Sequence, residues 1–184
     1  MADELDAETK LAVYALALGR YKDLISEKES RNISEIRARV SPYNDFIRRL
    51  RDSFIADMVP YEPGRHFLDA AERAMDYVRR IRTIEFAFTF WMDFSEMEKL
   101  KVATAMDKAI LLAALLRSLE SEDARVLVTK KGKAMVRFTF KTASYMFLAE
   151  SGSLLMGDDA SRLVSDDPIS YSFNDTVFES YDES

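Results

Sequence analysis

The sequence contains no cysteine, and this absence removes several classes of site together. Disulfides, thiol catalysis and cysteine-ligated zinc all need the missing side chain. A histidine metal centre or a Ser-His-Asp triad would depend on the single histidine, His66, whose neighbours indicate an exposed position at a helix start. Five glycines leave little room for a glycine-rich phosphate loop, and the sequence contains none. We therefore expect no metal site and no cofactor.

Long apolar runs are also missing, so no stretch is long enough to span a bilayer. The first eight residues are acidic and lack the basic-then-apolar pattern of a secretory signal. The net charge of −6 favours solubility and argues against a nucleic-acid partner. At 184 residues the default is one domain. We expect a single-domain cytoplasmic protein without a membrane partner.

Two groups of charged residues raise other possibilities. The arginine groups are Arg48, Arg49, Arg51 and Arg79, Arg80, Arg82. Acidic residues are interspersed among them and no base-reading motif accompanies them, so we interpret both groups as solvated helix faces. The aspartate group is Asp158, Asp159, Asp166 and Asp167. It lacks the ordered spacing of a calcium loop, so turn and cap roles are expected.

Helical spacing of apolar residues predicts four helices in the first 83 residues. They are expected at residues 4–28, 32–40 and 44–58, with a fourth that follows the turn at Val59–Gly64 and ends near Arg82. Asn44 is a suitable N-cap for the third. We interpret the first helix as one that packs an apolar stripe against the core, or that lies as a flap over the domain. We prefer this interpretation to a partner-binding helix. A swap of this helix between protomers, and hence a homo-oligomer, stays open.

Residues 104–119 are the most apolar helix candidate in the chain. Ala109 to Leu116 is an unbroken run of Ala, Ile and Leu without Gly or Pro. The run is apolar on every face, which is typical of a helix surrounded by protein. Asp107 in the first turn and Arg117 in the last turn both suit the helix dipole. The pattern predicts a buried central helix.

The flanking segments predict an antiparallel sheet. After the central helix, strands are expected at residues 124–129, 132–141, 145–149, 154–156 and 169–173, with a short helix at 158–164. In the second strand Ala134 and Val136 alternate with Lys133 and Met135, which predicts one buried and one wet or functional face. Before the helix, the aromatic-rich residues 83–94 alternate as a strand does. Residues 175–184 form an acidic tail that we expect to fray.

The predicted fold class is therefore α+β. Residues 1–83 are mainly helical, and residues 84–184 contain the central helix packed on an antiparallel sheet. This order of elements resembles the core of transglutaminase-like cysteine enzymes, which is itself papain-like. The resemblance is carried by Met106–Leu119 (MDKAILLAALLRSL), then Ala124-Arg-Val, then Gly132-Lys-Ala-Met-Val. In that family a Gly-Asp-Cys-Glu-Asp type segment opens the buried helix, and Gly-His-Ala-Trp-Val lies on a later strand.

Carried over residue by residue, the resemblance fails at the catalytic positions. The family's Cys falls on Ala105, its His on Lys133 and the Trp of the same strand on Met135. Its Asp falls near Ala149, whereas Asp107 and Lys108 match the pattern that follows the Cys. A helix N-terminus and an imidazolium normally activate the thiol, but Ala105 offers no nucleophile. The resemblance implies a relative without catalytic residues.

Two functions follow from this interpretation. The first is a binding or protein-interaction module whose vestigial cleft lies near the following residues: Ala105, Met106, Asp107, Lys133, Met135, Ala149 and Trp91. The partner, a protein or a small molecule, is unidentified. The second is an enzyme that uses non-thiol chemistry in the same cleft, with Lys133 as a desolvated base or amine nucleophile beside Asp107. An accidental resemblance, in an otherwise ordinary helical-plus-sheet domain, is the third reading.

Overall fold

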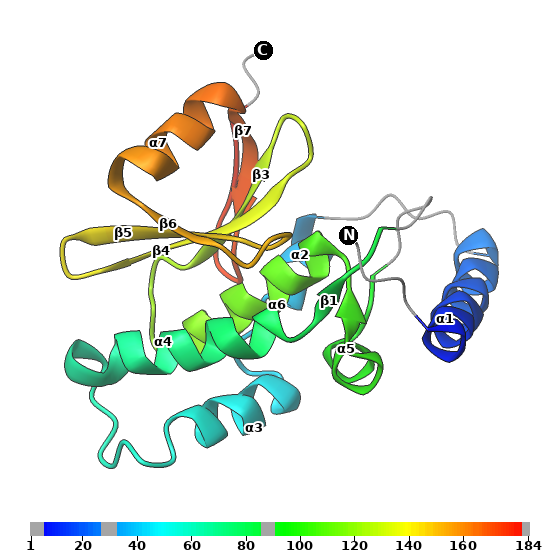
Figure 1. Ribbon diagram of the computed structural model, residues 1–184, viewed down its shortest axis with the longest axis horizontal. Helices are drawn as coiled ribbons and strands as arrows, with labels where there is room; N and C mark the ends of the chain where they lie inside the picture. The colour runs from blue at the N-terminus through cyan, green and yellow to red at the C-terminus, as the bar shows by residue number, and fades with distance from the viewer. Residues whose placement is uncertain (1–5, 27–32, 86–90, 182–184) are drawn as a thin grey trace.

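A computed structural model describes residues 6–26, 33–85 and 91–181, and within these ranges the protein is α+β, as predicted (Figure 1). The helices are α1 (Ala7–Ser26), α2 (Ile33–Arg39), α3 (Asp45–Phe54), α4 (Pro63–Arg79), α5 (Phe94–Leu100), α6 (Ala105–Ser118) and α7 (Gly157–Asp166). The strands are β1 (Arg82–Thr83), β2 (Val102–Ala103), β3 (Arg125–Thr129), β4 (Ala134–Phe140), β5 (Ala143–Leu148), β6 (Leu154–Met156), β7 (Ile169–Phe173) and β8 (Phe178–Ser180).

Local sequence signals fix several helix starts. The Asn44 side chain accepts a hydrogen bond from the Phe46 backbone N–H at 2.9 Å, so the predicted N-cap of α3 is confirmed. Thr104 caps α6 by accepting from the Asp107 N–H at 3.1 Å. Pro63 is the first residue of α4, where its missing N–H costs no helical hydrogen bond. These caps set where each helix begins, and α6 in particular.

The main sheet is antiparallel in the order β6-β5-β4-β3-β7-β8, and β1 pairs with β2 in a separate parallel ladder. Figure 1 shows α4 and α6 on one face of the main sheet and α7 on the other. The buried residues of α6 run without a break from Asp107 to Leu116. They pack against α3, α4 and strands β3 and β4, so the predicted buried central helix on a sheet is confirmed.

The outer face of the sheet agrees with the prediction only in part. We expected one wet or functional face in residues 132–141, and Lys133 and Thr139 on that face are exposed, but Met135 is 1% exposed. It forms a second apolar cluster with Leu127 and Met146, and α7 supplies Leu163 and Val164 to cover it. The strand period identifies the two faces correctly. It does not reveal that a later helix returns to cover one of them.

Two segments also differ from the sequence prediction. Residues 86–90 of the expected strand at 83–94 lie outside the described residues, and the segment ends in helix α5, which begins at Phe94. The acidic tail is not frayed throughout, because residues 178–180 form β8 on the edge of the sheet. The start of the tail is also anchored, because the Asp175 carboxylate pairs with Arg117 at 2.6 Å and both side chains are 15% exposed. The residues beyond 181 lie outside the described part.

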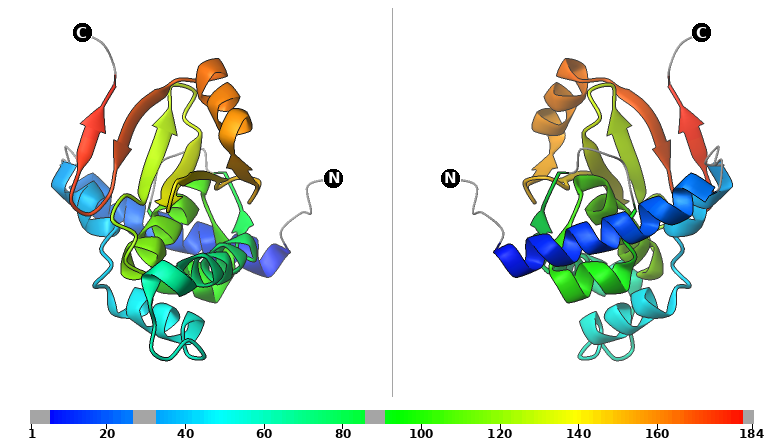
Figure 2. Two further views of the ribbon diagram at one scale, coloured as in Figure 1. Left: turned by 90° about the vertical axis from the view of Figure 1, so that its left-hand side faces the viewer. Right: turned by 90° about the vertical axis from the view of Figure 1, so that its right-hand side faces the viewer.

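The first helix lies along the side of the molecule beside α5 (Figure 2). Val13 and Ala17 are buried, whereas Leu11 and Tyr14 on its other side are exposed. Val13 and Ala17 belong to the main core, so α1 presents one apolar stripe to the rest of the chain. Within the part of the chain that the structure covers, no helix has the length and apolar character needed to cross a bilayer.

Candidate functional site

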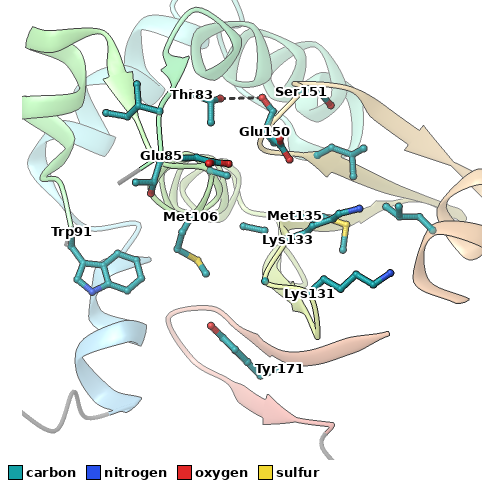
Figure 3. A pocket seen from close by; sticks show the side chains of 17 residues that line it. Thr83, Glu85, Trp91, Met106, Lys131, Lys133, Met135, Glu150, Ser151 and Tyr171 are labelled. Carbon is teal, nitrogen blue, oxygen red and sulfur yellow. Dashed lines mark hydrogen bonds between the residues drawn. The ribbon is translucent and has the colours of Figure 1, made fainter. Parts of the chain in front are cut away.

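A cavity of about 810 Å³ lies where the N-terminus of α6 faces the β3–β4 hairpin (Figure 3). We refer to it as the Ala105 cavity. Its lining residues are Thr83, Ile84, Glu85, Trp91, Thr104, Ala105, Met106, Lys131, Gly132, Lys133, Ala134, Met135, Leu148, Glu150, Ser151, Leu163 and Tyr171. They come from segments far apart in the sequence, which the fold gathers at one end of the central helix.

Five of the seven cleft candidates line this cavity: Trp91, Ala105, Met106, Lys133 and Met135. Asp107 and Ala149 do not. Each residue of an α-helix is rotated by about 100° from the one before, so Asp107 is directed well away from Ala105. Ala149 is fully buried, and its N–H donates to the Ala134 carbonyl at 3.3 Å, which makes it part of the sheet core.

The helix side of the cavity consists of Thr104, Ala105 and Met106. This end of α6 carries the positive pole of the helix dipole, the environment that would acidify a thiol. Ala105, which is half-buried, places only a methyl group there. The site therefore has the electrostatic environment that would stabilise a thiolate, but it has no cysteine sulfur.

The opposite wall is polar and open to solvent. Lys131 and Lys133 flank Gly132, whose positive φ of 79° allows the tight hairpin. Both lysine side chains are exposed. Figure 3 shows them across the cavity from Trp91, with Glu85 and Glu150 along another side. Tyr171 reaches the cavity from β7, and partial burial raises the pKa of its hydroxyl.

A buried lysine exists, but it is Lys108 and not Lys133. Lys108 is 3% exposed, and its Nζ donates to Thr83 Oγ1 at 2.9 Å. Thr83 Oγ1 donates in turn to the Glu150 carbonyl at 3.0 Å, so Lys108 lies one hydrogen bond behind the cavity wall. Burial lowers the pKa of Lys108. The sequence analysis named Lys108 only as part of the family pattern, and its place beside the apolar run does not show whether its side chain is buried.

Asp107 lies on another side of α6 and lines a second cavity, of about 470 Å³. Its Oδ2 accepts from Thr104 Oγ1 at 2.8 Å and its Oδ1 from the Met92 N–H at 3.4 Å. Burial raises the pKa of Asp107 to about 6, against the opposing effects of these hydrogen bonds and of the Arg39 charge. The carboxylate thus combines a capping role with an unusually desolvated position.

Other candidates have local structural roles. His66 lies in the first turn of α4, and its Nδ1 accepts from the Glu62 N–H at 3.1 Å. Asp167 accepts from Thr129 Oγ1 at 2.8 Å and from the Lys131 N–H at 3.1 Å, which confirms the turn role expected for this aspartate. No group of three or more metal-ligating His, Asp or Glu side chains occurs among the described residues.

Comparison with family models, with curated proteins and with solved structures gave no match. The resemblance to transglutaminase-like enzymes therefore depends on the residues quoted from the sequence alone.

Proposed function

We propose that this protein is a non-catalytic relative of the transglutaminase-like enzymes and that it binds a protein or small-molecule partner in the Ala105 cavity. One observation carries the proposal. The residues at the family's Cys, His and Trp positions, which are Ala105, Lys133 and Met135, line one cavity at the start of the buried helix. Trp91 lines it as well. This meeting of distant residues is the geometry that the resemblance implies.

The chemistry of the lining supports binding more than catalysis. Ala105 has no nucleophilic atom, and the chain has no cysteine to replace it. The only histidine is held by the Glu62 N–H and does not line the cavity. A volume of about 810 Å³ is within the usual range for ligand sites. Methionine side chains such as Met106 adapt their shape to a bound surface.

The alternative function is an enzyme in which Lys133 and Asp107 act together. It has less support, because Lys133 lines the Ala105 cavity and Asp107 lines the second cavity. Lys133 is also exposed, whereas the alternative needs a desolvated amine.

Site-directed photo-cross-linking tests the proposal, because an introduced cysteine is the only thiol in the chain. Ser151→Cys places a maleimide-linked cross-linker at the rim of the Ala105 cavity, and Ser161→Cys, on α7, is a matched exposed control. We expect a partner from the native cell extract to be captured at position 151 and not at position 161. Adding Ala105→Phe, which places a ring at the helix side of the cavity, should reduce that capture.

Two results would refute the proposal. One is capture of the same species at both positions, with no effect of Ala105→Phe. The other is transamidase or peptidase activity of the purified protein that disappears on Lys133→Met. The second result would favour the alternative enzyme.

A further inference from the structure

Lys108 is a buried amine that the binding proposed above does not use. Its side chain lies in the first turn of α6 and is 3% exposed. The Nζ atom donates one hydrogen bond, to Thr83 Oγ1 at 2.9 Å, although an ammonium group has three N–H donors. Within the part of the chain that the structure describes, this side chain has no other hydrogen-bond partner and no ion pair. A single neutral hydroxyl therefore holds the amine.

The side chain of Lys108 is directed toward the Ala105 cavity. Residues three apart on a helix share a side, so Lys108 lies one turn below Ala105. Long side chains on a helix point back toward its N-terminus, which is the end of α6 at the cavity. Thr83 lines the cavity, contacts Nζ and donates to the Glu150 carbonyl (Figure 3). Nζ thus lies directly behind Thr83, and the flexible lysine stem can bring it into the cavity.

No negative charge stabilises the protonated form of this amine. Glu85 and Glu150 line the same cavity, but neither forms an ion pair with Lys108. Burial lowers the pKa of Lys108, and no neighbouring charge opposes that shift. Lys131 and Lys133, the other amines of the cavity, are exposed to water. Lys108 is therefore the lysine of this site with the larger share of the neutral, nucleophilic amine.

We propose that Lys108 forms an imine with an aldehyde that enters the Ala105 cavity. The Nζ lone pair adds to the carbonyl carbon to form the C–N bond, and the aldehyde oxygen then leaves as water with both hydrogens of the neutral amine. Trp91, Met106 and Tyr171 offer apolar surface for the body of the aldehyde. This inference rests on the proposed function, because it names the class of small molecule that the cavity binds.

The buried position favours the imine over the free ammonium group. An imine nitrogen can be neutral, so its formation removes a charge that neither water nor a carboxylate compensates. Its lone pair can also accept a hydrogen bond from the Thr83 hydroxyl. At Lys131 and Lys133 water solvates the ammonium group, so the same reaction brings no such gain. The reaction should therefore select Lys108 from the three lysines at this site.

Reductive trapping on the purified protein tests the proposal. Hexanal is added with sodium cyanoborohydride, which converts an imine to a stable secondary amine, and peptide mass spectrometry gives the alkylation rate at each lysine. At about pH 6.5 an exposed lysine is almost entirely protonated, so we expect alkylation at Lys108 to be at least about fivefold faster than at the exposed Lys99 of α5. That ratio should fall as the pH rises to about 9.5. A rate at Lys108 equal to or below that at Lys99 at pH 6.5 would overturn the proposal.

Two variants test the route through the cavity. Ala105→Phe places a ring at the helix side of the cavity and should slow alkylation at Lys108 several-fold without changing the rate at Lys99. Ala56→Phe makes the same change at an exposed position and should alter neither rate. An unchanged rate at Lys108 in Ala105→Phe would overturn the cavity route. Because the trapping needs no cell extract, it can fail while the capture at position 151 succeeds, and the reverse, so the two proposals fail separately.

Discussion

Replacing Asp107 with asparagine is expected to stabilise the protein at neutral pH by about 1–3 kcal/mol, measured as the free energy of unfolding in urea. Burial raises the pKa of Asp107 from 3.8 to about 6, which means that the ionised side chain is less favourable in the folded than in the unfolded protein. An amide of nearly the same shape has no charge to desolvate. Its oxygen can still accept from Thr104 or from Met92.

The sign of the Asp107 contribution to stability at each pH follows from the protons that the folded and unfolded states bind. Between about pH 4 and pH 6 the folded protein binds more protons at Asp107 than the unfolded chain does. The contribution of this residue to stability is therefore fully present below about pH 4, is lost as the pH rises to about 6, and stays lost above that. The difference between the unmodified protein and Asp107→Asn should grow over this window and then level off.

Asp158→Asn is the control, because it removes one exposed carboxylate from α7 and should change stability by less than about 0.5 kcal/mol. Asp107→Asn being less stable than the unmodified protein at neutral pH would contradict the account. The hydrogen bonds to Thr104 and Met92 would then outweigh the desolvation of the charge.

Shortening a buried side chain at the centre of α6 is expected to have the largest destabilising effect. Leu112 is 0% exposed and belongs to the main core between α3, α4 and the sheet. Leu112→Ala should lower the free energy of unfolding by about 3–5 kcal/mol, because it loses buried apolar surface and leaves a cavity that rigid neighbours on all sides cannot fill. Urea denaturation followed by circular dichroism measures the change.

Leu11→Ala is the matched comparison, since it makes the same chemical change on α1 at a side chain that is 71% exposed. Its effect should be within about 0.5 kcal/mol. Equal effects of the two substitutions would mean that α6 is not the centre of the core.

The sequence predicts the local features of this fold well. An unbroken Ala/Ile/Leu run identifies α6 as buried, because a helix apolar on every face has no side to present to water. The cap at Asn44 is likewise local, and the structure confirms it. Burial alternates in β4 from Val136 to Thr139 but not at Met135, which is buried. What the sequence does not give is which element covers which face. The return of α7 over Met135 and the anchoring of Asp175 by Arg117 are both contacts between distant residues.

In the candidate site, too, the sequence predicts the local features but not the contacts between distant residues. Five predicted residues meet in the Ala105 cavity, because they flank the start of α6 and one hairpin that faces it. The separation of Asp107 from Ala105 was available from helix geometry, at about 100° per residue, although the family pattern groups them in sequence. The burial of Lys108 and Asp107 is visible only in the structure. No periodicity in the sequence distinguishes a buried ionisable residue at a helix start from an exposed one.

The most direct test of the central claim is the acidity of a thiol placed at position 105. Ala105→Cys gives the protein a single cysteine, and the pH dependence of its alkylation by iodoacetamide gives the pKa of that thiol. We predict a value below about 7.5. Ala56→Cys, at an exposed position outside any helix, should give about 8.5. A pKa at position 105 that equals the control would contradict the assignment of Ala105 to the lost nucleophile position.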